Sequence, residues 1–451
     1  MVKVNFAMRE EGQMLVMLAF VLPLLVLFSG LAIDGGILYI TKARLSKSVD
    51  AACLDTMLNL GLGQSAASAI GTNIFNANFG TDPPVPTITY PLDKNGNQMV
   101  QVNATANVQT LFMKYIPTLS TVPVSAMAQA TRGKLVMSLI LDRSGSMKLD
   151  QGNVALQSAV PTFVGHFSDT LDEVAMVSFA SYSSVDVPMG YNFTTPITNA
   201  VKAMNFSGAT FGTGAGTKPI LDNSHGAPFS LGKLQNDSVL IPPGQNVAKV
   251  IVYFTDGLMN TVQDQFACWQ SGVKHTPIIN FGGCDAGTCS PDDTVAILDY
   301  TNGNQWGWFT YSGGSSGFPF DSNPTDICKD SNGNNVITFP SQTGAGVQKT
   351  MTRQNVTAEA QYRAIQTAIA LRSETPIPTV IFTIGLGNGV DGNTQAFLAQ
   401  LANDPNYPTY ISSQPAGAFF YVPNCPSSTC TNDLQQVFNE IAAKVLLRLT
   451  G

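Results

Sequence analysis

The stretch Leu139-Ile140-Leu141-Asp142-Arg143-Ser144-Gly145-Ser146-Met147 joins an apolar run to a turn that carries one carboxylate and two hydroxyls. The run 136–141 is largely apolar and lacks the alternation of a half-exposed strand, which predicts a strand buried on both faces. A second run of this kind, 250–255, is followed by Asp256 and Gly257. Ligands of doubly wound sheets bind outside the carboxyl ends of the strands, so we expect these residues to converge at one edge.

The rest of the C-terminal region alternates apolar runs with amphipathic stretches. Further strands are predicted at 174–179 and 380–384, and helices at 154–167, 358–371 and 432–447. Buried strands spaced by helices predict an α/β fold with a doubly wound, mostly parallel sheet over residues 134–449. The segment 257–356 is rich in Gly, Asn, Ser and aromatic residues and carries four Cys, and we interpret it as an insertion.

The turn reads D-x-S-x-S and aims oxygen atoms at one point. Hard divalent cations bind such oxygen ligands, and Mg²⁺ takes six of them while keeping several waters. The carboxylates of Asp142 and Asp256 would repel each other at one edge without a cation. The alternative role for Asp142 is a helix N-cap, which needs one side chain and not three.

The two signatures DRSGSM (142–147) and FTDGLMN (254–260) resemble those of the von Willebrand factor A domain and its metal-ion-dependent adhesion site. The resemblance implies that Asp142, Ser144 and Ser146 bind the metal and that Asp256 binds it directly or through water. It also implies a Thr ligand from the Gly-rich loop 207–216, for which we favour Thr210 over Thr213. The implied cofactor is a divalent cation, Mg²⁺ first and Mn²⁺ or Ca²⁺ as alternatives, and the implied partner is a protein that supplies an acidic residue to it.

A membrane segment is predicted near the N-terminus. Residues 14–33 are twenty residues without a charge, about 30 Å as a helix, which suffices to cross a bilayer. A cleaved signal peptide is the alternative, but the apolar stretch is long and no Ala-x-Ala-like site follows it before Asp34. Basic residues flank both ends of the span, so they do not set its orientation. The helix is predicted to continue to about Gly61 or Gly63, as in a type IV pilin-like subunit.

The run from Arg9 to Leu54 resembles the N-terminal segment of Tad (Flp) pilus-assembly proteins of the TadE/TadG type. The resemblance rests on the charged entry at 9–12, the Leu22-Pro23 pair, the exit at 32–34 and the small-residue helix 48–52. It implies a tail, a transmembrane helix and a helical extension over 1–62. Residues 63–133 are predicted to form a small β-rich, membrane-proximal region with strands at 87–90, 99–106 and 122–130.

Composition favours an exported protein. The 451 residues have a net charge of −7 and only 12% charged residues, so no basic surface favours nucleic acid. Six of the seven Cys lie after residue 267, which favours disulfides in an oxidising compartment over free thiols or zinc. The loop from Cys425 to Cys430 is short enough for these two to pair with each other, which would leave the insertion Cys to pair among themselves and Cys53 unpaired. The Cys distribution places the C-terminal region in the periplasm or outside the cell.

These observations predict a non-enzymatic protein. Its expected function is that of a membrane-anchored, extracytoplasmic, metal-dependent binding component of Tad/Flp-type pilus assembly or secretion, with pilus or envelope secretion subunits as partners. A cell-surface adhesin that binds an external ligand is the first alternative. A metal-dependent hydrolase is the second, disfavoured because no second Asp follows Asp142 two residues on and no His or Lys base is close in sequence.

Overall fold

The structure is a computed structural model that describes residues 11–115, 117–149, 151–180, 183–206, 227–259 and 353–449, with short segments between 261 and 350. The chain divides into two compact units, Met1–Arg132 and Gly133–Leu449. Each unit is described by itself.

The first unit is organised by one long helix, α1 (Glu11–Leu58), which continues through Pro23. Its large side chains from Met17 to Ile33 are mostly exposed, whereas Leu45, Val49 and Ala52 are fully buried. Among the described helices it is the one long and apolar enough to cross a membrane. The predicted long apolar helix is therefore confirmed, and its buried residues lie in the part that packs against the rest of this unit.

A second helix, α2 (Gln64–Phe79), follows the short 3₁₀ turn η1 (Leu60–Leu62) and was not predicted from the sequence. Its contact residues Ala67, Gly71 and Phe75 recur every fourth position and are buried. A Cβ atom on Gly71 would lie 1.9 Å from the Thr56 hydroxyl of α1. The segment gives a weak helical signal, because Gly71 and its three Asn residues have low helix propensity.

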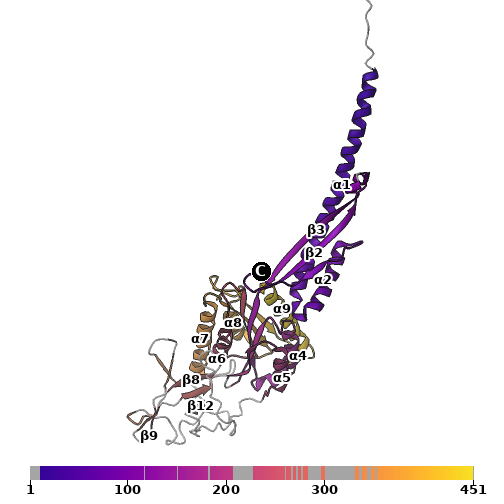
Figure 1. Ribbon diagram of the computed structural model, residues 1–451. Coiled ribbons are helices and arrows are strands. Elements are labelled where there is room, and N and C mark those ends of the chain that lie inside the picture. Colours follow the sequence, from indigo (N-terminus) through magenta and orange to yellow (C-terminus); the bar gives the residue numbers. More distant parts are fainter. Residues whose placement is uncertain are drawn as a thin grey trace, which may run out of the picture. The chain divides into compact units, whose positions relative to one another are not determined.

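An antiparallel sheet completes the first unit. Its strands are β1 (Thr87–Thr89), β2 (Gln98–Gln109) and β3 (Thr121–Arg132), and β2 and β3 pair in register from Gln98–Arg132 to Gln109–Thr121. Figure 1 shows this hairpin running beside α1. Alternate residues of β2, from Val100 to Ala106, are buried, and the Cys53 thiol of α1 donates to the Val100 carbonyl at 3.3 Å. The three predicted strands are all present, and β2 and β3 extend beyond their predicted ends.

The second unit is built on a six-stranded sheet with the order β16-β15-β7-β4-β5-β6. The strands are β4 (Lys134–Asp142), β5 (Glu173–Phe179), β6 (Ser183–Gly190), β7 (Val247–Thr255), β15 (Thr379–Leu386) and β16 (Ala418–Val422). All neighbours are parallel except β5 and β6. Counted along the chain this is the order 3-2-1-4-5-6 of doubly wound sheets, so the predicted α/β class is confirmed.

Helices cover both faces of this sheet (Figure 1). One face packs against α4 (Gly152–Val164), α5 (Thr194–Ala203) and α9 (Cys430–Leu449), and the other against α6 (Ala227–Asp237), α7 (Arg353–Arg372) and α8 (Gly392–Ala402). Strand β4 serves both layers, because Leu139 and Leu141 join the first core and Ile140 joins the second. A strand buried on both faces explains the apolar run before Asp142.

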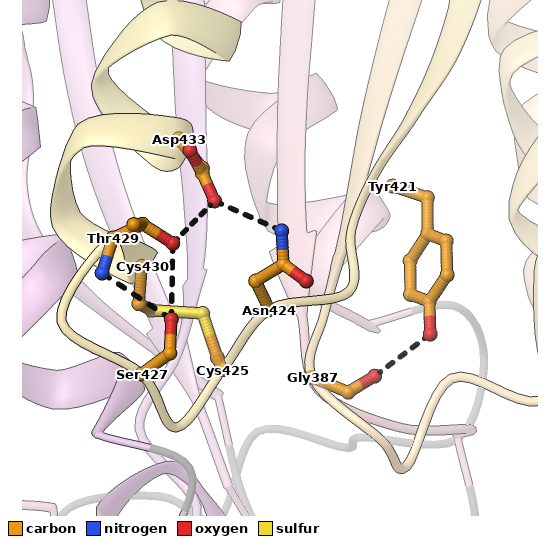
Figure 2. The surroundings of a disulfide bond; sticks show 8 residues. All are labelled: Gly387, Tyr421, Asn424, Cys425, Ser427, Thr429, Cys430 and Asp433. Atoms are coloured by element: carbon orange, nitrogen blue, oxygen red, sulfur yellow. Dashed lines mark hydrogen bonds between the residues drawn. A yellow bond between two sulfur atoms is a disulfide. The ribbon is translucent and has the colours of Figure 1, made fainter.

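Seven short strands between β7 and α7 pair only with one another in the described segments. They are β8 (Thr261–Gln265), β9 (Cys268–Gln270), β10 (Val273–His275), β11 (Ile278–Gly282), β12 (Ala296–Asp299), β13 (Thr338–Pro340) and β14 (Gln348–Thr350). The predicted pairing among the insertion Cys lies outside the described side chains. The predicted pairing of Cys425 with Cys430 is confirmed by their disulfide (Figure 2), and Cys53 is a buried free thiol.

Candidate functional site

The carboxyl ends of β4 and β7 lie side by side at the centre of the six-stranded sheet. Leu141 of β4 pairs with Phe254 of β7, so Asp142 follows at the level of Thr255, and Asp256 comes directly after it. Beside β4 the sheet continues with β5 and β6, and on the other side, beside β7, it continues with β15 and β16. This is the topological switch point, where open α/β sheets bind their ligands.

Asp142 is held by hydrogen bonds from both strand ends. Its Oδ1 accepts the Ser144 backbone N–H at 2.7 Å, and its Oδ2 accepts the Thr255 hydroxyl at 2.7 Å. The side chain is 4% exposed. Helix α3 (Ser146–Leu149) begins only after Ser144, so the bond to Ser144 is not that of an N-cap on α3. The described contacts therefore orient the carboxylate at the strand end and do not use it to start a helix.

Ser144 and Ser146 bring their hydroxyls together beside this carboxylate. Their Oγ atoms are 2.9 Å apart, and Ser146 is exposed at the start of α3. Two contacts hold the turn 142–147 in place. Met147 is fully buried, and the Arg143 N–H donates to the Phe179 carbonyl of β5 at 2.8 Å. Four of the five predicted ligands, Asp142, Ser144, Ser146 and Asp256, thus lie at this edge. The fifth, Thr210, and its alternative Thr213 lie outside the described residues.

Thr255 takes part in this site and was not predicted from the sequence. Its hydroxyl donates to Asp142, lies 3.1 Å from the Gly257 carbonyl and accepts the Gly257 N–H at 3.2 Å. It therefore links the turn after β7 to the turn after β4. The available signal was its position, the last residue of a buried strand directly before Asp256, but a Thr there is also an ordinary strand residue.

Burial at this edge shifts the pKa values of two ionisable side chains, Asp142 and Tyr253. Burial raises the pKa of Asp142, and hydrogen bonds from Thr255 and Ser144 oppose the rise only in part. Tyr253 is fully buried between the rings of Phe179 and Phe229, at centroid distances of 5.3 and 4.9 Å. Burial, with the negative charges of Asp142 and Asp256, raises the pKa of Tyr253 well above its ordinary value. The edge thus concentrates negative charge in an environment of low polarity.

The loop after β15 closes this edge over Asp256. A Cβ on Gly389 would lie 2.5 Å from the Asp256 carbonyl oxygen, so only glycine allows this approach. The same loop is tied to β16, because the Gly387 N–H donates to the Val422 carbonyl at 2.9 Å and the Tyr421 hydroxyl donates to the Gly387 carbonyl at 3.3 Å (Figure 2).

The disulfide stabilises the next connection at this edge, from β16 to α9. Figure 2 shows Asn424 and Thr429 on either side of the disulfide, both bound to Asp433 in the first turn of α9, at 3.3 and 3.0 Å. A carboxylate in the first turn of a helix also interacts favourably with the helix dipole. The loops after β15 and β16 are therefore held in place by covalent and polar contacts.

The chemistry of the donor set suits a hard cation. Within the described part of the chain, no three His, Cys, Asp or Glu side chains come together as a metal cluster. A site at this edge therefore depends on hydroxyls beside two carboxylates, and all of these donors are oxygen atoms. Such a set fits Mg²⁺ better than zinc, which favours nitrogen and sulfur ligands.

Solved structures with weak overall similarity were found. Proximal thread matrix protein 1 from the mussel byssus is 12% identical with a TM-score of 0.33, over 70% of this chain and 46% of its own. The pilus adhesin SpaC from Lactobacillus rhamnosus GG is 11% identical with a TM-score of 0.39, over 82% of this chain and 35% of its own. This chain thus spans less than half of each of these two. The vWF domain of the type V pili tip protein Mfa5 from Porphyromonas gingivalis is 14% identical with a TM-score of 0.36, over 71% of this chain and 98% of its own.

The sequence itself matches a pilus-assembly family in its N-terminal part. No curated protein matches the chain. Residues 12–57 match the Tad family, described as Flp pilus-assembly TadE/G-like, and these residues make up nearly all of α1. The segment 12–57 of the first unit is therefore a Tad, TadE/G-like region.

Proposed function

We propose that this protein is a membrane-anchored, extracytoplasmic component of a Tad/Flp-type pilus-assembly or secretion system that binds a protein partner through a divalent cation. The TadE/G-like match over 12–57 and the exposed apolar half of α1 support the anchor. The Cys425–Cys430 disulfide supports an oxidising compartment for the second unit. The C-terminal region would then lie in the periplasm or outside the cell.

The proposed cation ligands are Asp142, Ser144, Ser146 and Asp256, with Thr210 as the fifth. The observation that carries this proposal is the hydrogen bond from Thr255 to Asp142, which joins the ends of β4 and β7 at the switch point of the sheet. A bound cation would supply positive charge where two buried carboxylates otherwise repel each other. Mg²⁺ is the proposed ion, with Mn²⁺ and Ca²⁺ as alternatives.

The partner is proposed to be a pilus or envelope secretion subunit that presents an Asp or Glu to the cation. This chain is acidic overall, with a net charge of −7, so a bound cation is the most direct way for it to attract a carboxylate. The role of Asp142, Ser144 and Ser146 is then to hold and orient the ion, and no chemical step is required of them. A hydrolase remains disfavoured, because Ser144 stands where a second catalytic Asp would be needed.

Calorimetric titration of the full chain with Mg²⁺, Mn²⁺ and Ca²⁺ tests the metal proposal. Wild type is expected to bind at least one of these ions, and Asp142→Ala is expected to lose that binding while the chain stays folded. Ser146→Ala removes one hydroxyl and is expected to weaken binding less than loss of the charged ligand. Equal binding by wild type and Asp142→Ala would refute the proposed site.

Two measurements in cells test the rest of the proposal. Protease added to intact spheroplasts is expected to digest the chain beyond residue 64, and full protection until lysis would refute the orientation. Comparing wild-type cells with cells that lack the pilus genes separates assembly from adhesion. An assembly component is expected to lose its partner complexes in the mutant cells, whereas an adhesin that binds an external ligand would keep its surface exposure and binding.

A further inference from the structure

The loop between β2 and β3 presents large apolar side chains to its surroundings. Leu111 is 52% exposed, Phe112 is 41% exposed and Tyr115 is 82% exposed. The loop includes the one-turn 3₁₀ helix η2 (Met113–Tyr115), and Lys114 beside these residues is exposed as well. Exposing a cluster of apolar side chains to water is unfavourable, and such clusters mark sites of contact with a membrane or another molecule.

Asp34 of α1 fixes the level of this loop along the helix. Its carboxylate accepts the backbone N–H groups of Leu111, Phe112 and Met113 at 2.8, 3.0 and 2.7 Å, and its side chain is 1% exposed. Hydrogen bonds to an ionised acceptor are stronger than those between neutral groups. The same three bonds satisfy the carboxylate that comes directly after the uncharged span, so the cost of burying it there is compensated.

Phe112 reaches past Asp34 toward the apolar half of α1. A Cβ on Gly30 would lie 2.6 Å from Cγ of Phe112, so the ring occupies space that only a glycine leaves open. Gly30 comes three residues before Ile33, the last residue of the uncharged stretch, which at 1.5 Å per residue is about 5 Å inside it. The loop is therefore level with the end of the apolar span and overlaps it.

We propose that the β2–β3 loop is a second membrane contact, in which Leu111, Phe112 and Tyr115 enter the lipid interface on the side where α1 leaves the bilayer. This inference rests on the proposed membrane anchor, against which Phe112 of the loop lies at Gly30. Aromatic side chains are favoured at the headgroup level, and Lys114 can reach lipid phosphates from the same place. The contact sets how deep α1 sits in the membrane and which side of it faces the hairpin.

Lipid photocrosslinking of the full chain, reconstituted in vesicles of phosphatidylcholine and phosphatidylglycerol, tests this proposal. Benzoylphenylalanine is introduced one position at a time, as Leu27→benzoylphenylalanine in the span and as the corresponding Leu111, Tyr115 and Leu92 variants. Leu92 is the matched control, since it is 64% exposed but bridges to Gln98, at the opposite end of β2. That end is roughly 35 Å away along the strand.

The expected result is lipid adducts at positions 27, 111 and 115, with at least fivefold less at 92. Adducts at 27 without adducts at 111 and 115 would overturn the interfacial loop and leave the anchor intact. Absence of adducts at 27 would overturn the anchor and, with it, this inference. Equal adducts at 92 and 111 would show that exposed positions are labelled wherever they lie, and would overturn the proposed lipid contact of the loop. Asp34→Ala is expected to lower labelling at 111 severalfold without changing it at 27, and unchanged labelling at 111 would refute the role of Asp34.

Discussion

If Mg²⁺ binds at the proposed site, replacing Asp142 by Asn should remove about half or more of the stabilisation that the ion gives the second unit. A ligand that binds only the folded state at 100 times its dissociation constant stabilises it by about 2.7 kcal/mol. At about 2 °C per kcal/mol for a unit of this size, wild type should gain roughly 5 °C in Tm. Asn keeps an oxygen for the Ser144 N–H but carries no charge. Replacing a residue that only supports a metal ligand typically costs about 10- to 100-fold in metal affinity, and we expect at least this loss when the ligand itself is replaced.

The metal-free proteins provide the internal check on folding. Asp142→Asn loses an ionised acceptor for Thr255, but it also removes a charge from a side chain that is buried at this edge. We therefore expect the metal-free variant to melt no lower than metal-free wild type. The assay is thermal denaturation of the full chain in detergent, followed by circular dichroism, with chelator or with increasing Mg²⁺.

Asp172→Asn is the matched control. Asp172 is also a buried carboxylate of this sheet, and it accepts the N–H groups of Leu135 and Ser168 at 3.0 and 2.8 Å, at the opposite end of β4. This variant should melt lower than wild type but keep the full Mg²⁺-dependent shift. An equal Mg²⁺-dependent shift in wild type and Asp142→Asn would refute the reasoning, because the charge at the strand end would then be irrelevant to the ion.

Three further outcomes follow from contacts described above. Serine at both Cys425 and Cys430 should cost about 2 kcal/mol, from the loop-entropy relation for a sequence separation of 5, and the variant should melt like reduced wild type in a thermal scan. Gly71→Ala should destabilise the contact of α2 with α1 by about 1–3 kcal/mol, visible as faster amide exchange in α2, and adding Thr56→Ala should recover part of this loss. Asp391 caps α8 and accepts the N–H three residues on, which lowers its pKa, so Asp391→Ala should cost about 1 kcal/mol in chemical denaturation at pH 7. This cost should be present above the unfolded pKa of about 3.9 and vanish as the pH falls through the lower folded value, and a constant cost down to pH 2 would contradict it.

The central strands of the sheet were predictable because they are buried on both faces. The runs at 136–141, 174–179, 250–255 and 380–384 all lie within strands of the six-stranded sheet. The two strands that were not predicted, β6 and β16, are its edges. Edge strands are only partly buried, and β6 also contains Pro188, so neither shows a continuous apolar run.

The candidate site was predictable where it follows directly from strand ends. Asp142, Ser144, Ser146 and Asp256 were expected at one edge, and the described structure has them there. Thr255 was not predictable, because its bond to Asp142 depends on the register between β4 and β7, which no local pattern encodes. The role of Thr210 as a ligand stays a prediction.

In the N-terminal helix, too, the local pattern was predictable and the tertiary contacts were not. The long apolar helix was predictable from 14–33, because twenty uncharged residues leave few other options. The partners of Asp34 were not, because a carboxylate that ends an apolar span reads as an ordinary boundary residue. Its bonds to the β2–β3 loop join residues 77 to 79 positions apart.

Under the proposed function, the distance in sequence between the two central strand ends would also determine where an ion can be acquired. Asp142 and Thr255 are 113 residues apart, so their oxygen atoms meet only after β4 and β7 have paired. If the chain is exported unfolded, as the proposed location implies, it has no such cluster on the way and carries no cation with it. Completion of the sheet and uptake of the ion would then be one event on the far side of the membrane. The cations abundant in that compartment, and not those of the cytosol, would decide which ion the protein holds.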